Sequence, residues 1–495
     1  MDLHVSLAGR GDLAERIYRQ LRDAILDGRL RPGEKLPPTR ELAGRLDVSR
    51  NTVTAAYDRL SADGFLVGKV GAGTFVSALP ATRLRTRKAP GGSGVRPRRV
   101  WQSIDVPEPV QIDAPFDFRV GVADSGLFPI ETWRRLVTRE LRASVVQSAK
   151  YHDPTGDAGL RAAIARHIGI SRSVRAGADD VLVTHGAQQA LDLVGRVLIE
   201  PGTCVAVEEP GYGHARLLFR SLGARVVGVP VDDEGLDVAA IPNGARLVYA
   251  TPSHQFPLST PMSLARRAAL LAWAERHRAV IVEDDYDSEF RFSDRPLEPL
   301  QSLDPGGRVV YVGSFSKTLL PMLRMGFLVA PASLQAALRN AKQLTDRHGE
   351  HPTQAALARF IDDGHLARHV RAATRDYAAR HARIAALLAV DFADWLRVVP
   401  SAAGLHLCAR VAPGVAVDVD DVLRRAAASG VRAESLAEFC AEAPAQPGLV
   451  LGYGAVHEDR IDEGMRHIAA AFRAAVGRQT ASVPAWTSTG SPSPC

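Results

Sequence analysis

The chain has 495 residues, of which 46% are hydrophobic and 23% are charged. This length exceeds what one hydrophobic core accommodates, and the composition is that of a globular protein rather than a disordered chain. No apolar run is long enough to span a membrane, and the N-terminus shows no secretion signal. The four cysteines lie far apart without a CxxC pair, which offers neither a zinc site nor a disulfide framework and favours a cytoplasmic location.

The net charge of +6 is unevenly distributed along the chain. Residues 1–100 hold 19 Lys+Arg and 10 Asp+Glu, a balance of +9, so the remainder holds 61−19 = 42 basic and 55−10 = 45 acidic residues, a balance of −3. A basic excess confined to one part predicts a polyanionic partner for that part, although a solvated basic surface has the same composition.

Residues 12–78 predict a small helical domain that ends in a two-stranded ribbon. Residues 12–27 repeat apolar side chains at helical spacing, and Thr39 is expected to cap a short helix of sequence TRELAGRL. After a tight turn, SRNTVTAAYDRLSADG predicts another helix, and FLVGKVGAGTFV predicts two short strands. This order of elements is typical of a winged helix-turn-helix domain that binds DNA.

The second helix of this motif begins at Ser49-Arg50-Asn51-Thr52. Because the first residues of a recognition helix meet base edges in the major groove, these four residues are candidate DNA contacts. Arg50 suits guanine or phosphate, and its polar neighbours suit phosphate or base. Lys69, in the predicted ribbon, suits phosphate or the minor groove. Each of these side chains would also be ordinary on a solvated helix face.

Two further segments have too few apolar residues to predict a packed core. Residues 79–113 combine arginines with prolines and a Gly-Gly-Ser-Gly run, which predicts a flexible basic linker. Residues 479–495, of sequence QTASVPAWTSTGSPSPC, predict a disordered tail.

Between residues 114 and 478, short apolar runs alternate with amphipathic segments. Seven runs are predicted strands: VLVT (181–184), CVAVEE (204–209), RVVGVP (225–230), LVYATP (247–252), AVIVED (279–284), VVYVGS (309–314) and GFLVA (326–330). The alternation predicts an α/β domain with a seven-stranded, mainly parallel sheet, and the mostly helical part after residue 331 predicts a smaller C-terminal α/β lobe. In such sheets, ligands bind beyond the carboxyl ends of the strands.

The polar residues after two of these strands suit pyridoxal 5′-phosphate. Gly186, Ala187 and Gln188 open a helix after the first predicted strand, where backbone N–H groups suit a phosphate. Asp284 ends another strand, and a carboxylate there would keep a pyridine nitrogen protonated. Tyr286 follows, and its phenol suits the hydroxyl of the ring.

A third strand runs into Gly313-Ser314-Phe315-Ser316-Lys317, with Arg324 seven residues later. A lysine amine forms a Schiff base with the aldehyde of the cofactor, and serine and arginine side chains hold its phosphate. Taken singly, each residue has an ordinary alternative, such as a solvated loop charge, a cap or a surface ion pair. The combination, in this order and at strand ends, is far more specific.

The stretches GSFSKTLLPMLRMGF and VEDDYDSEFRF resemble fold type I pyridoxal-phosphate enzymes of the aspartate aminotransferase class. The similarity extends to YHDPTGDAGLRAAI, THGAQQALDL and VEEPGYGHAR and covers roughly residues 114–475. LPPTRELAGRLDVSRNTVTAAYDRLSADGFL resembles the DNA-binding domain of GntR regulators. The joined domains resemble the MocR family (also called GabR-type), which are transcription factors with an aminotransferase-like effector domain.

This resemblance implies roles for individual residues. Lys317 would form the Schiff base, Asp284 would pair with the pyridine nitrogen, and Tyr286 would bind the ring hydroxyl. Tyr212, in EEPGY, would lie against the face of the ring. Tyr151 resembles the residue that reaches the phosphate of the neighbouring subunit, which implies a head-to-tail homodimer.

The remaining implied contacts belong to the phosphate and to DNA. Ser314, Ser316 and Arg324 would join the backbone of residues 186–188 around the phosphate. Arg40, on the first helix of the helix-turn-helix motif, resembles the GntR arginine that contacts DNA. The family therefore implies double-stranded promoter DNA as one partner and a small-molecule effector as another.

The sequence departs from the enzymes at two places. Aminotransferases have an asparagine before Pro-Thr-Gly, whereas this chain has HQFPLS with Phe256 and Ser259, and HQFP is frequent in MocR proteins. Amino-acid-binding members also have a carboxylate-binding arginine near the C-terminus, where this chain has Val450 in GLVLGYG. The first departure favours a regulator over an enzyme.

The GABA-sensing type has a further arginine where this chain has His214, although Arg216 or Arg220 remain alternative clamps. The effector is therefore expected to differ from a plain α- or γ-amino carboxylate held in the usual way. Pyridoxal phosphate itself is one candidate effector.

Three functions remain open from the sequence. The first is a pyridoxal-phosphate-dependent transcription regulator that binds promoter DNA and senses an amino compound or the cofactor. The second is a working aminotransferase with an accessory DNA-binding domain. The retained Lys317 is consistent with this function, whereas the missing carboxylate-binding arginine argues against efficient turnover. The third is a regulator with an inert scaffold, which the intact set of cofactor residues disfavours.

Overall fold

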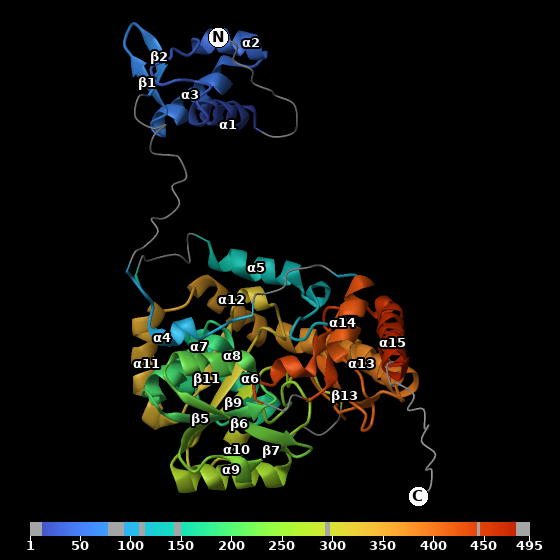
Figure 1. Cartoon of the computed structure of the whole chain (residues 1–495). Coiled ribbons are helices and arrows are strands. Elements are labelled where there is room, and N and C mark those ends of the chain that lie inside the picture. Colours follow the sequence, from blue (N-terminus) through green and yellow to red (C-terminus); the bar gives the residue numbers. More distant parts are fainter. Residues whose placement is uncertain are drawn as a thin grey trace, which may run out of the picture. The chain divides into compact units, whose positions relative to one another are not determined.

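The computed structural model describes residues 12–77, 94–107, 114–142, 150–292, 298–442 and 446–481, with side chains described as far as residue 476. The chain forms two compact units, Met1–Pro97 and Arg98–Cys495 (Figure 1). Most of the predicted linker and all of the predicted tail beyond residue 481 lie outside the described residues. Among the described helices, none is long and apolar enough to cross a membrane.

The first unit is the predicted winged helix-turn-helix. Its elements are α1 (Leu13–Leu26), α2 (Thr39–Leu46), α3 (Arg50–Ala62), β1 (Leu66–Lys69) and β2 (Gly73–Val76). The two strands pair antiparallel, with Leu66 opposite Val76. A single apolar cluster that includes Ile17, Leu21 and Val53 joins the three helices. The predicted fold of residues 12–77 is confirmed.

The starts of the helices differ in how they are capped. Ser49 Oγ accepts from Thr52 N (3.1 Å) and thereby caps α3. The prediction that Thr39 caps α2 is wrong, because Thr39 is the first helical residue. Pro38 occupies the cap position in an extended conformation, and its carbonyl accepts from the backbone of Glu41 (2.9 Å) and Leu42 (3.0 Å). A proline provides no capping side chain.

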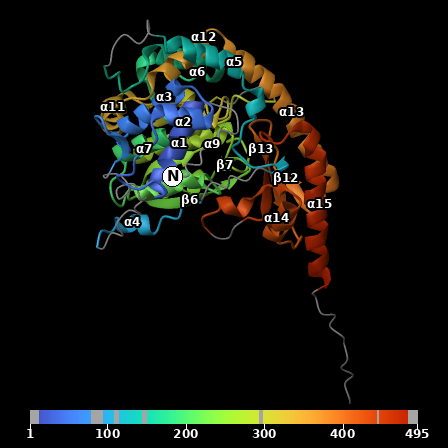
Figure 2. The same cartoon turned by 90° about the horizontal axis from the view of Figure 1, so that it is seen from above.

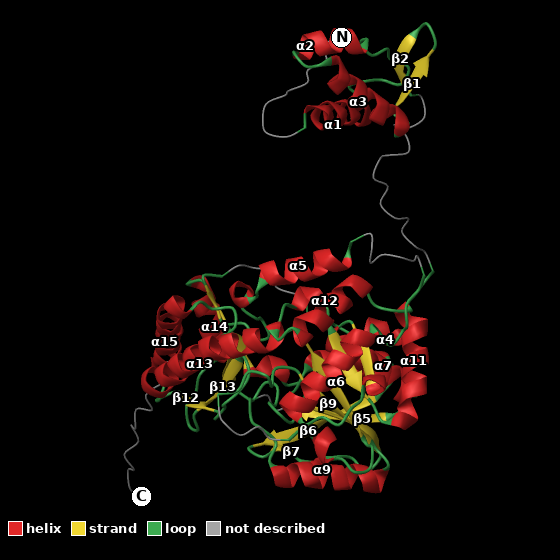
Figure 3. Cartoon of the chain, turned by 180° about the vertical axis from the view of Figure 1, so that it is seen from behind, coloured by secondary structure: helices red, strands yellow, loops and turns green. Residues whose placement is uncertain are grey.

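A large sheet organises the second unit (Figure 3). Its strand order is β4-β11-β10-β9-β8-β5-β6-β7. These strands are β4 (Val181–Thr184), β5 (Cys204–Glu209), β6 (Arg225–Asp232), β7 (Gly235–Leu236), β8 (Ala245–Ala250), β9 (Val280–Asp285), β10 (Val309–Ser314) and β11 (Gly326–Val329). All seven predicted strands form, and β7 adds an eighth at the edge. Only β11 and β7 run antiparallel to their neighbours in this sheet.

Helices cover both faces of the sheet because successive strand residues point to opposite sides. Val181 and Val183 pack in one apolar cluster with residues of α6 (Ala158–Arg172) and α12 (His351–Asp362). Leu182 packs in another cluster with residues of α7 (Gly186–Leu198) and α11 (Ala332–Asp346). The helices of this part are α5 (Ile130–Glu140), α6 (Ala158–Arg172), α7 (Gly186–Leu198), α8 (Gly213–Ser221), α9 (Leu264–His277), α10 (Leu300–Leu303), α11 (Ala332–Asp346) and α12 (His351–Asp362).

The second unit begins inside the segment predicted as a linker. Residues Arg99–Gln102 form the short helix α4, which packs on α8. Arg98 donates from Nη2 to the carbonyl of Ser221 (3.2 Å). Residues 98–102 therefore belong to the effector unit, whereas a sequence of prolines and arginines predicts only a flexible chain.

A smaller lobe lies at one end of this unit, as predicted. The long helices α13 (His365–Asp391) and α15 (Glu458–Ala481) run side by side along it (Figure 2). Its sheet has the order β12-β13-β16-β15, and β14 pairs with β3. These elements are β3 (Phe116–Asp117), β12 (Leu396–Val398), β13 (His406–Val411), α14 (Val419–Ala428), β14 (Val431–Arg432), β15 (Glu434–Ser435) and β16 (Gly448–Gly452).

Candidate functional site

A cavity of about 680 Å³ lies beyond the carboxyl ends of the central strands. Because β4, β5, β8, β9 and β10 are parallel, the residues that follow them meet at one edge of the sheet. Nine of the residues predicted to hold the cofactor line the cavity: Ala187, Gln188, Tyr212, Asp284, Tyr286, Ser314, Ser316, Lys317 and Arg324. The small lobe contributes Leu405, His406, Glu434, Glu438 and Phe439.

Lys317 brings a partly buried amine into this cavity from the loop after β10. Its Nζ donates to the carbonyl of Gly121 (2.5 Å), which belongs to the segment after β3. Burial lowers the pKa of Lys317, against the opposing effect of Asp287 and Asp284. A lowered pKa increases the fraction of neutral amine, which is the form that attacks carbonyl carbon.

Asp284 is a buried carboxylate with spare hydrogen-bonding capacity. Its Oδ2 accepts from the hydroxyl of Tyr249 on β8 (2.8 Å), whereas Oδ1 has no hydrogen-bond partner among the described residues. Burial raises the pKa of Asp284 to about 7. An unpaired carboxylate oxygen at a cavity wall suits a cationic N–H group, which would lower this pKa again.

An anion site lies at the start of α7. Gly186 has φ +73°, and a Cβ there would lie 3.2 Å from Nη2 of Arg324. Arg324, itself at φ +51°, donates from Nη2 to the carbonyl of His185 (2.8 Å). Ser314 Oγ lies nearby on the chain and accepts from Ser316 N (3.1 Å). The helix N-terminus, the guanidinium and the hydroxyls together suit a phosphate.

Aromatic rings form part of the walls. Tyr212 follows β5 and occupies the cap position of α8. Its ring lies 5.9 Å from that of Phe256 in an edge-on arrangement, and Phe256 lies 5.1 Å from Phe439 in the same way. Burial raises the pKa of Tyr212 to about 12, so its hydroxyl is neutral. These rings offer flat apolar surface to a planar ligand.

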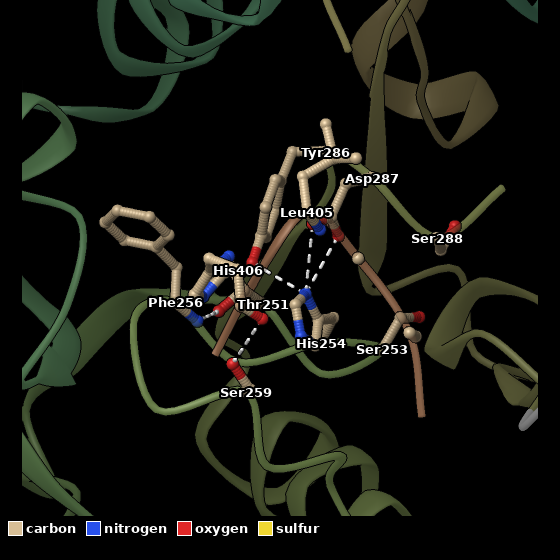
Figure 4. Close-up of polar contacts among 12 residues, drawn as sticks. Thr251, Ser253, His254, Phe256, Ser259, Tyr286, Asp287, Ser288, Leu405 and His406 are labelled. Atoms are coloured by element: carbon tan, nitrogen blue, oxygen red, sulfur yellow. Dashed lines mark hydrogen bonds and ion pairs between the residues drawn. The ribbon is translucent and has the colours of Figure 1, made fainter. Parts of the chain in front are cut away.

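Tyr286 is held by a buried hydrogen-bond network (Figure 4). Its hydroxyl lies 3.0 Å from Nδ1 of His254, and the same nitrogen lies 3.0 and 3.1 Å from the two carboxylate oxygens of Asp287. Nε2 of His254 lies 3.3 Å from Ser401 Oγ. The network fixes the orientation of the Tyr286 ring at the cavity wall.

His254, Asp287 and His406 are buried with ligand atoms within 4.8 Å of one another, a grouping that suits a metal ion. Both nitrogens of His254 already lie within hydrogen-bond distance of neighbouring side chains. Burial holds the pKa of His406 well below its usual range, so this ring is neutral. Asp287 and His406 line the cavity, and His254 lies within hydrogen-bond distance of both Asp287 and Tyr286.

The residues present fit pyridoxal 5′-phosphate. The cavity contains a partly buried amine of the kind that reacts with aldehydes, an anion site at a helix N-terminus, and a carboxylate oxygen without a partner in the described chain. These are the three groups that an aldehyde, a phosphate and a pyridine nitrogen require. The predicted residues Lys317, Asp284 and Arg324 supply them.

Tyr151 lies apart from these residues within one chain. Its side chain is exposed, and the guanidinium of Arg347 lies over its ring at 4.4 Å. The ring also lies 5.8 Å from that of His348. The expected role of Tyr151, contact with the phosphate of a neighbouring subunit, stays a prediction.

The expected carboxylate clamp has no substitute in the described cavity wall. Val450 is fully buried in β16 and packs with Leu436 and Cys408 instead of lining the cavity. Arg216 is paired with Glu209 and with Glu442. Among the described residues that line the cavity, only Lys317 and Arg324 are a lysine or an arginine, and His214 also lines it.

In the first unit, the predicted DNA contacts lie at the surface of α2, α3 and the ribbon. Arg40, Arg50 and Asn51 are exposed, and neither arginine has an ion pair or side-chain hydrogen bond with another residue that the structure describes. Ser49 and Thr52 share a hydrogen bond between their hydroxyls (2.8 Å), in addition to the cap of α3. Lys69 lies over the ring of Phe75 at 5.1 Å.

Sequence reasoning missed several residues of the cavity. Tyr249 on β8 was part of a predicted strand, and its hydroxyl within an apolar run was the available signal. The backbone of Val120 and Gly121 carries no side-chain signal at all. Glu434 and Glu438 come from the small lobe, and nothing in the local sequence associates them with Lys317.

Comparison with known proteins agrees with this two-unit architecture. Residues 13–76 match the family "Bacterial regulatory proteins, gntR family", and residues 121–436 match "Aminotransferase class I and II". The chain is 39% identical over 463 residues to the probable rhizopine catabolism regulatory protein MocR of Rhizobium meliloti, a match that covers 92% of this chain and 93% of that protein. It is 37% identical to the HTH-type transcriptional regulator TauR of Rhodobacter capsulatus, with 94% and 97% covered.

Solved structures of aminotransferases resemble the second unit. One is LysN, the α-aminoadipate aminotransferase of Thermus thermophilus, complexed with N-(5′-phosphopyridoxyl)-L-leucine. The two chains are 30% identical with a TM-score of 0.66, and the match covers 72% of this chain and 92% of the enzyme.

Proposed function

Because the chain belongs to the MocR-type transcription regulators, in which a GntR DNA-binding domain precedes an aminotransferase class I and II domain, we propose that its second unit holds pyridoxal 5′-phosphate and senses a small effector there. The first unit binds promoter DNA, and occupancy of the cavity changes that binding. An effector shifts DNA binding only if it has different affinities for the two states of the protein.

The cofactor proposal rests on one observation: Lys317, with its partly buried amine, and Asp284, whose Oδ1 has no partner among the described residues, line the same cavity. When bound, the cofactor supplies an aldehyde that reacts reversibly with amines. Lys317 would hold that aldehyde, and Asp284 would keep a proton on the ring nitrogen. Tyr286, oriented by His254, would donate to or accept from the ring hydroxyl.

The phosphate would be held by the start of α7. The backbone at Gly186, Ala187 and Gln188 would donate to it, together with Arg324 and the hydroxyls of Ser314 and Ser316. Tyr212 would lie against the ring. Tyr151, which is exposed in the single chain, would reach the phosphate of a second subunit in a head-to-tail homodimer.

For DNA, we propose that the N-terminus of α3 enters the major groove. Arg50 and Asn51 would meet bases, and Ser49, Thr52 and Arg40 would meet phosphates. Lys69, at the end of β1, would touch phosphate or the minor groove. The exposure of Arg40 and Arg50, without a described intramolecular partner, supports these roles.

The cofactor proposal is tested by reconstitution with pyridoxal 5′-phosphate, followed by dialysis and measurement of the visible absorbance that remains. The unsubstituted protein is expected to keep the chromophore, and Lys317→Ala is expected to lose it. Lys35→Ala serves as the control, because Lys35 is exposed, belongs to the first unit and does not line the cavity. Equal retention by Lys317→Ala would contradict the assignment.

A working aminotransferase is the alternative, favoured by the presence of Lys317 in the cavity. The described lining contains no arginine besides Arg324, so a substrate carboxylate would lack its usual orienting partner. This lack argues against efficient turnover. Multiple turnovers of an amino acid to a keto acid by the reconstituted protein would favour the enzyme.

A further inference from the structure

The wall of the cavity away from the anion site is acidic. Glu434, on β15, and Glu438, in the 3-10 turn Leu436–Phe439, line it together with Phe439. The described lining contains one lysine, Lys317, and one arginine, Arg324; Arg324 lies at the start of α7, where it donates to the carbonyl of His185. No described lysine or arginine of the lining neutralises the carboxylates of the small lobe.

Glu434 is tied to the neighbourhood of Lys317 by two consecutive residues. Its Oε2 accepts from the backbone N–H of Val120 (3.1 Å). The next residue, Gly121, accepts from Nζ of Lys317 (2.5 Å). Since one peptide unit separates these two contacts, a small molecule whose amine lies at Lys317 has Glu434 within its reach.

Both carboxylates keep an oxygen for a ligand. Oε1 of Glu434 and Oε2 of Glu438 accept no hydrogen bond from another described residue, whereas Oε1 of Glu438 accepts from Ser435 N (3.3 Å). Arg119, whose charge acts to lower the pKa of Glu434, donates to Asp117 at 2.8 and 2.5 Å. Oε1 of Glu434 and Oε2 of Glu438 can therefore accept hydrogen bonds from a ligand.

Building on the proposed function, we propose that the effector is an amine without a carboxylate, namely an amino polyol or a diamine, whose far end donates hydrogen bonds to Glu434 and Glu438. An amino acid in this orientation would bring its carboxylate against two carboxylates, and the described lining has no lysine or arginine besides Lys317 and Arg324 to pair with it. Hydroxyl or ammonium groups would find charged acceptors there.

The test is isothermal titration calorimetry of the protein loaded with pyridoxal 5′-phosphate. The probes are 1,4-diaminobutane as the diamine, glucamine as the amino polyol and 4-aminobutanoate as the amino acid of similar length. At least one of the first two is expected to bind about tenfold or more tightly than 4-aminobutanoate. Which of the two binds better distinguishes an ammonium from hydroxyls at the far end.

Substitutions of the two glutamates test whether these side chains bind the amine. Glu434→Gln removes the charge with little change of shape and is expected to weaken binding of the preferred amine about tenfold or more. Glu438→Arg, at an exposed position of the wall, is expected to reduce the preference for the amines over 4-aminobutanoate and to improve binding of 4-aminobutanoate. Glu200→Gln is the control, because Glu200 is exposed, has no described ion pair and lies outside the cavity lining.

The outcomes separate this inference from the proposed function. A loaded protein that binds 4-aminobutanoate as tightly as both amines, or that binds none of the three probes, contradicts the inference while the cofactor assignment stands. Unchanged amine binding in Glu434→Gln does the same. A protein that takes up no pyridoxal 5′-phosphate overturns the proposed function, and the inference fails with it.

Discussion

Asp284 and Asp285 are adjacent on β9 and face opposite sides of the sheet. Asp284 lines the cavity and accepts from the hydroxyl of Tyr249, whereas Asp285 forms a buried ion pair with Arg172 (2.8 Å). The hydroxyl of Tyr311 also donates to Asp285 (2.6 Å). Two neighbouring carboxylates thus separate into a ligand group and a structural group because strand side chains alternate.

Replacement of each aspartate by asparagine tests this separation. Asp284→Asn is expected to lower the affinity for pyridoxal 5′-phosphate by at least about tenfold, about 1.4 kcal/mol, because the amide cannot pair with a protonated ring nitrogen. The thermal stability of the cofactor-free protein is expected to hold or rise. The reason is that a raised carboxyl pKa destabilises the folded state above that pKa, and the amide removes this effect.

Asp285→Asn is expected to retain the affinity for pyridoxal 5′-phosphate and to lower the stability of the cofactor-free protein. Loss of its charge leaves Arg172 buried without its anionic partner, which costs about 3–5 kcal/mol of unfolding free energy. Differential scanning fluorimetry and cofactor titration measure both quantities in the same preparations. A loss of stability in Asp284→Asn with cofactor affinity retained would show that the two roles are misassigned.

Gly186→Ala is expected to damage the anion site. A Cβ at this position would lie 3.2–3.3 Å from three atoms of the Arg324 guanidinium, and φ of +73° is unfavourable for alanine. The affinity for inorganic phosphate and for pyridoxal 5′-phosphate should both fall.

Gly202→Ala provides the comparison for Gly186→Ala. Gly202 also has positive φ (+90°), but nothing lies within 4 Å of its Cβ position. Backbone strain alone should therefore leave ligand affinity unchanged. Equal losses of affinity in both variants would mean that the approach of Arg324 is unimportant.

Arg50→Ala is expected to weaken DNA binding and to reduce the salt dependence of affinity by about one unit of slope if it contacts phosphate. If it contacts guanine instead, the loss is about 1–3 kcal/mol and confined to one position of the operator. Arg45→Ala is the matched control on α2, because Arg45 is exposed but paired with Glu41. Fluorescence anisotropy with labelled DNA over a salt series measures both the affinity and its salt dependence. Equal behaviour of the two variants would exclude the placement of α3 in the groove.

The acidic wall predicts a pH dependence for diamine binding. Burial raises the pKa of Glu434 to about 7, with Glu438 and Asp117 acting in the same direction and Arg119 and the Val120 N–H against it. A carboxyl with a raised pKa is protonated below it, so it loses its charge as the pH falls. Diamine affinity should therefore decrease by roughly tenfold from about pH 8 to about pH 6.

Glu434→Gln isolates this contribution from those of Lys317 and Asp284, which also titrate in the cavity. The variant should bind the diamine more weakly and with a flatter pH profile. A profile as steep as that of the unsubstituted protein would assign the dependence to another group.

The sequence was sufficient to predict the strands because each is an apolar run between polar turns. β7 was missed because two residues, Gly235 and Leu236, form no recognisable pattern and pair only with the edge of β6. The cap of α2 was misjudged because threonine is a common cap, whereas Pro38 holds that position. Local patterns thus predict elements better than their ends.

Local sequence patterns likewise predicted some residues of the candidate site and missed others. Asp284, Ser314 and Lys317 were predictable because they follow parallel strands, whose ends meet by topology. The partner of Asp284, Tyr249, depends on the order of β8 and β9 in the sheet, which the sequence does not contain. Glu434 reaches the cavity only through the packing of the small lobe, so its charge carried no signal in the chain.

The most direct test of the central claim is binding of the purified full-length protein to double-stranded DNA upstream of its own gene, with and without pyridoxal 5′-phosphate, across a salt series. Specific binding is expected, with an affinity that falls roughly a thousandfold or more between low and moderate salt. The affinity for DNA is also expected to change on addition of the cofactor, and this change should be absent in Lys317→Ala. Binding that is identical with and without the cofactor, in both proteins, would contradict the claim that the second unit controls the first.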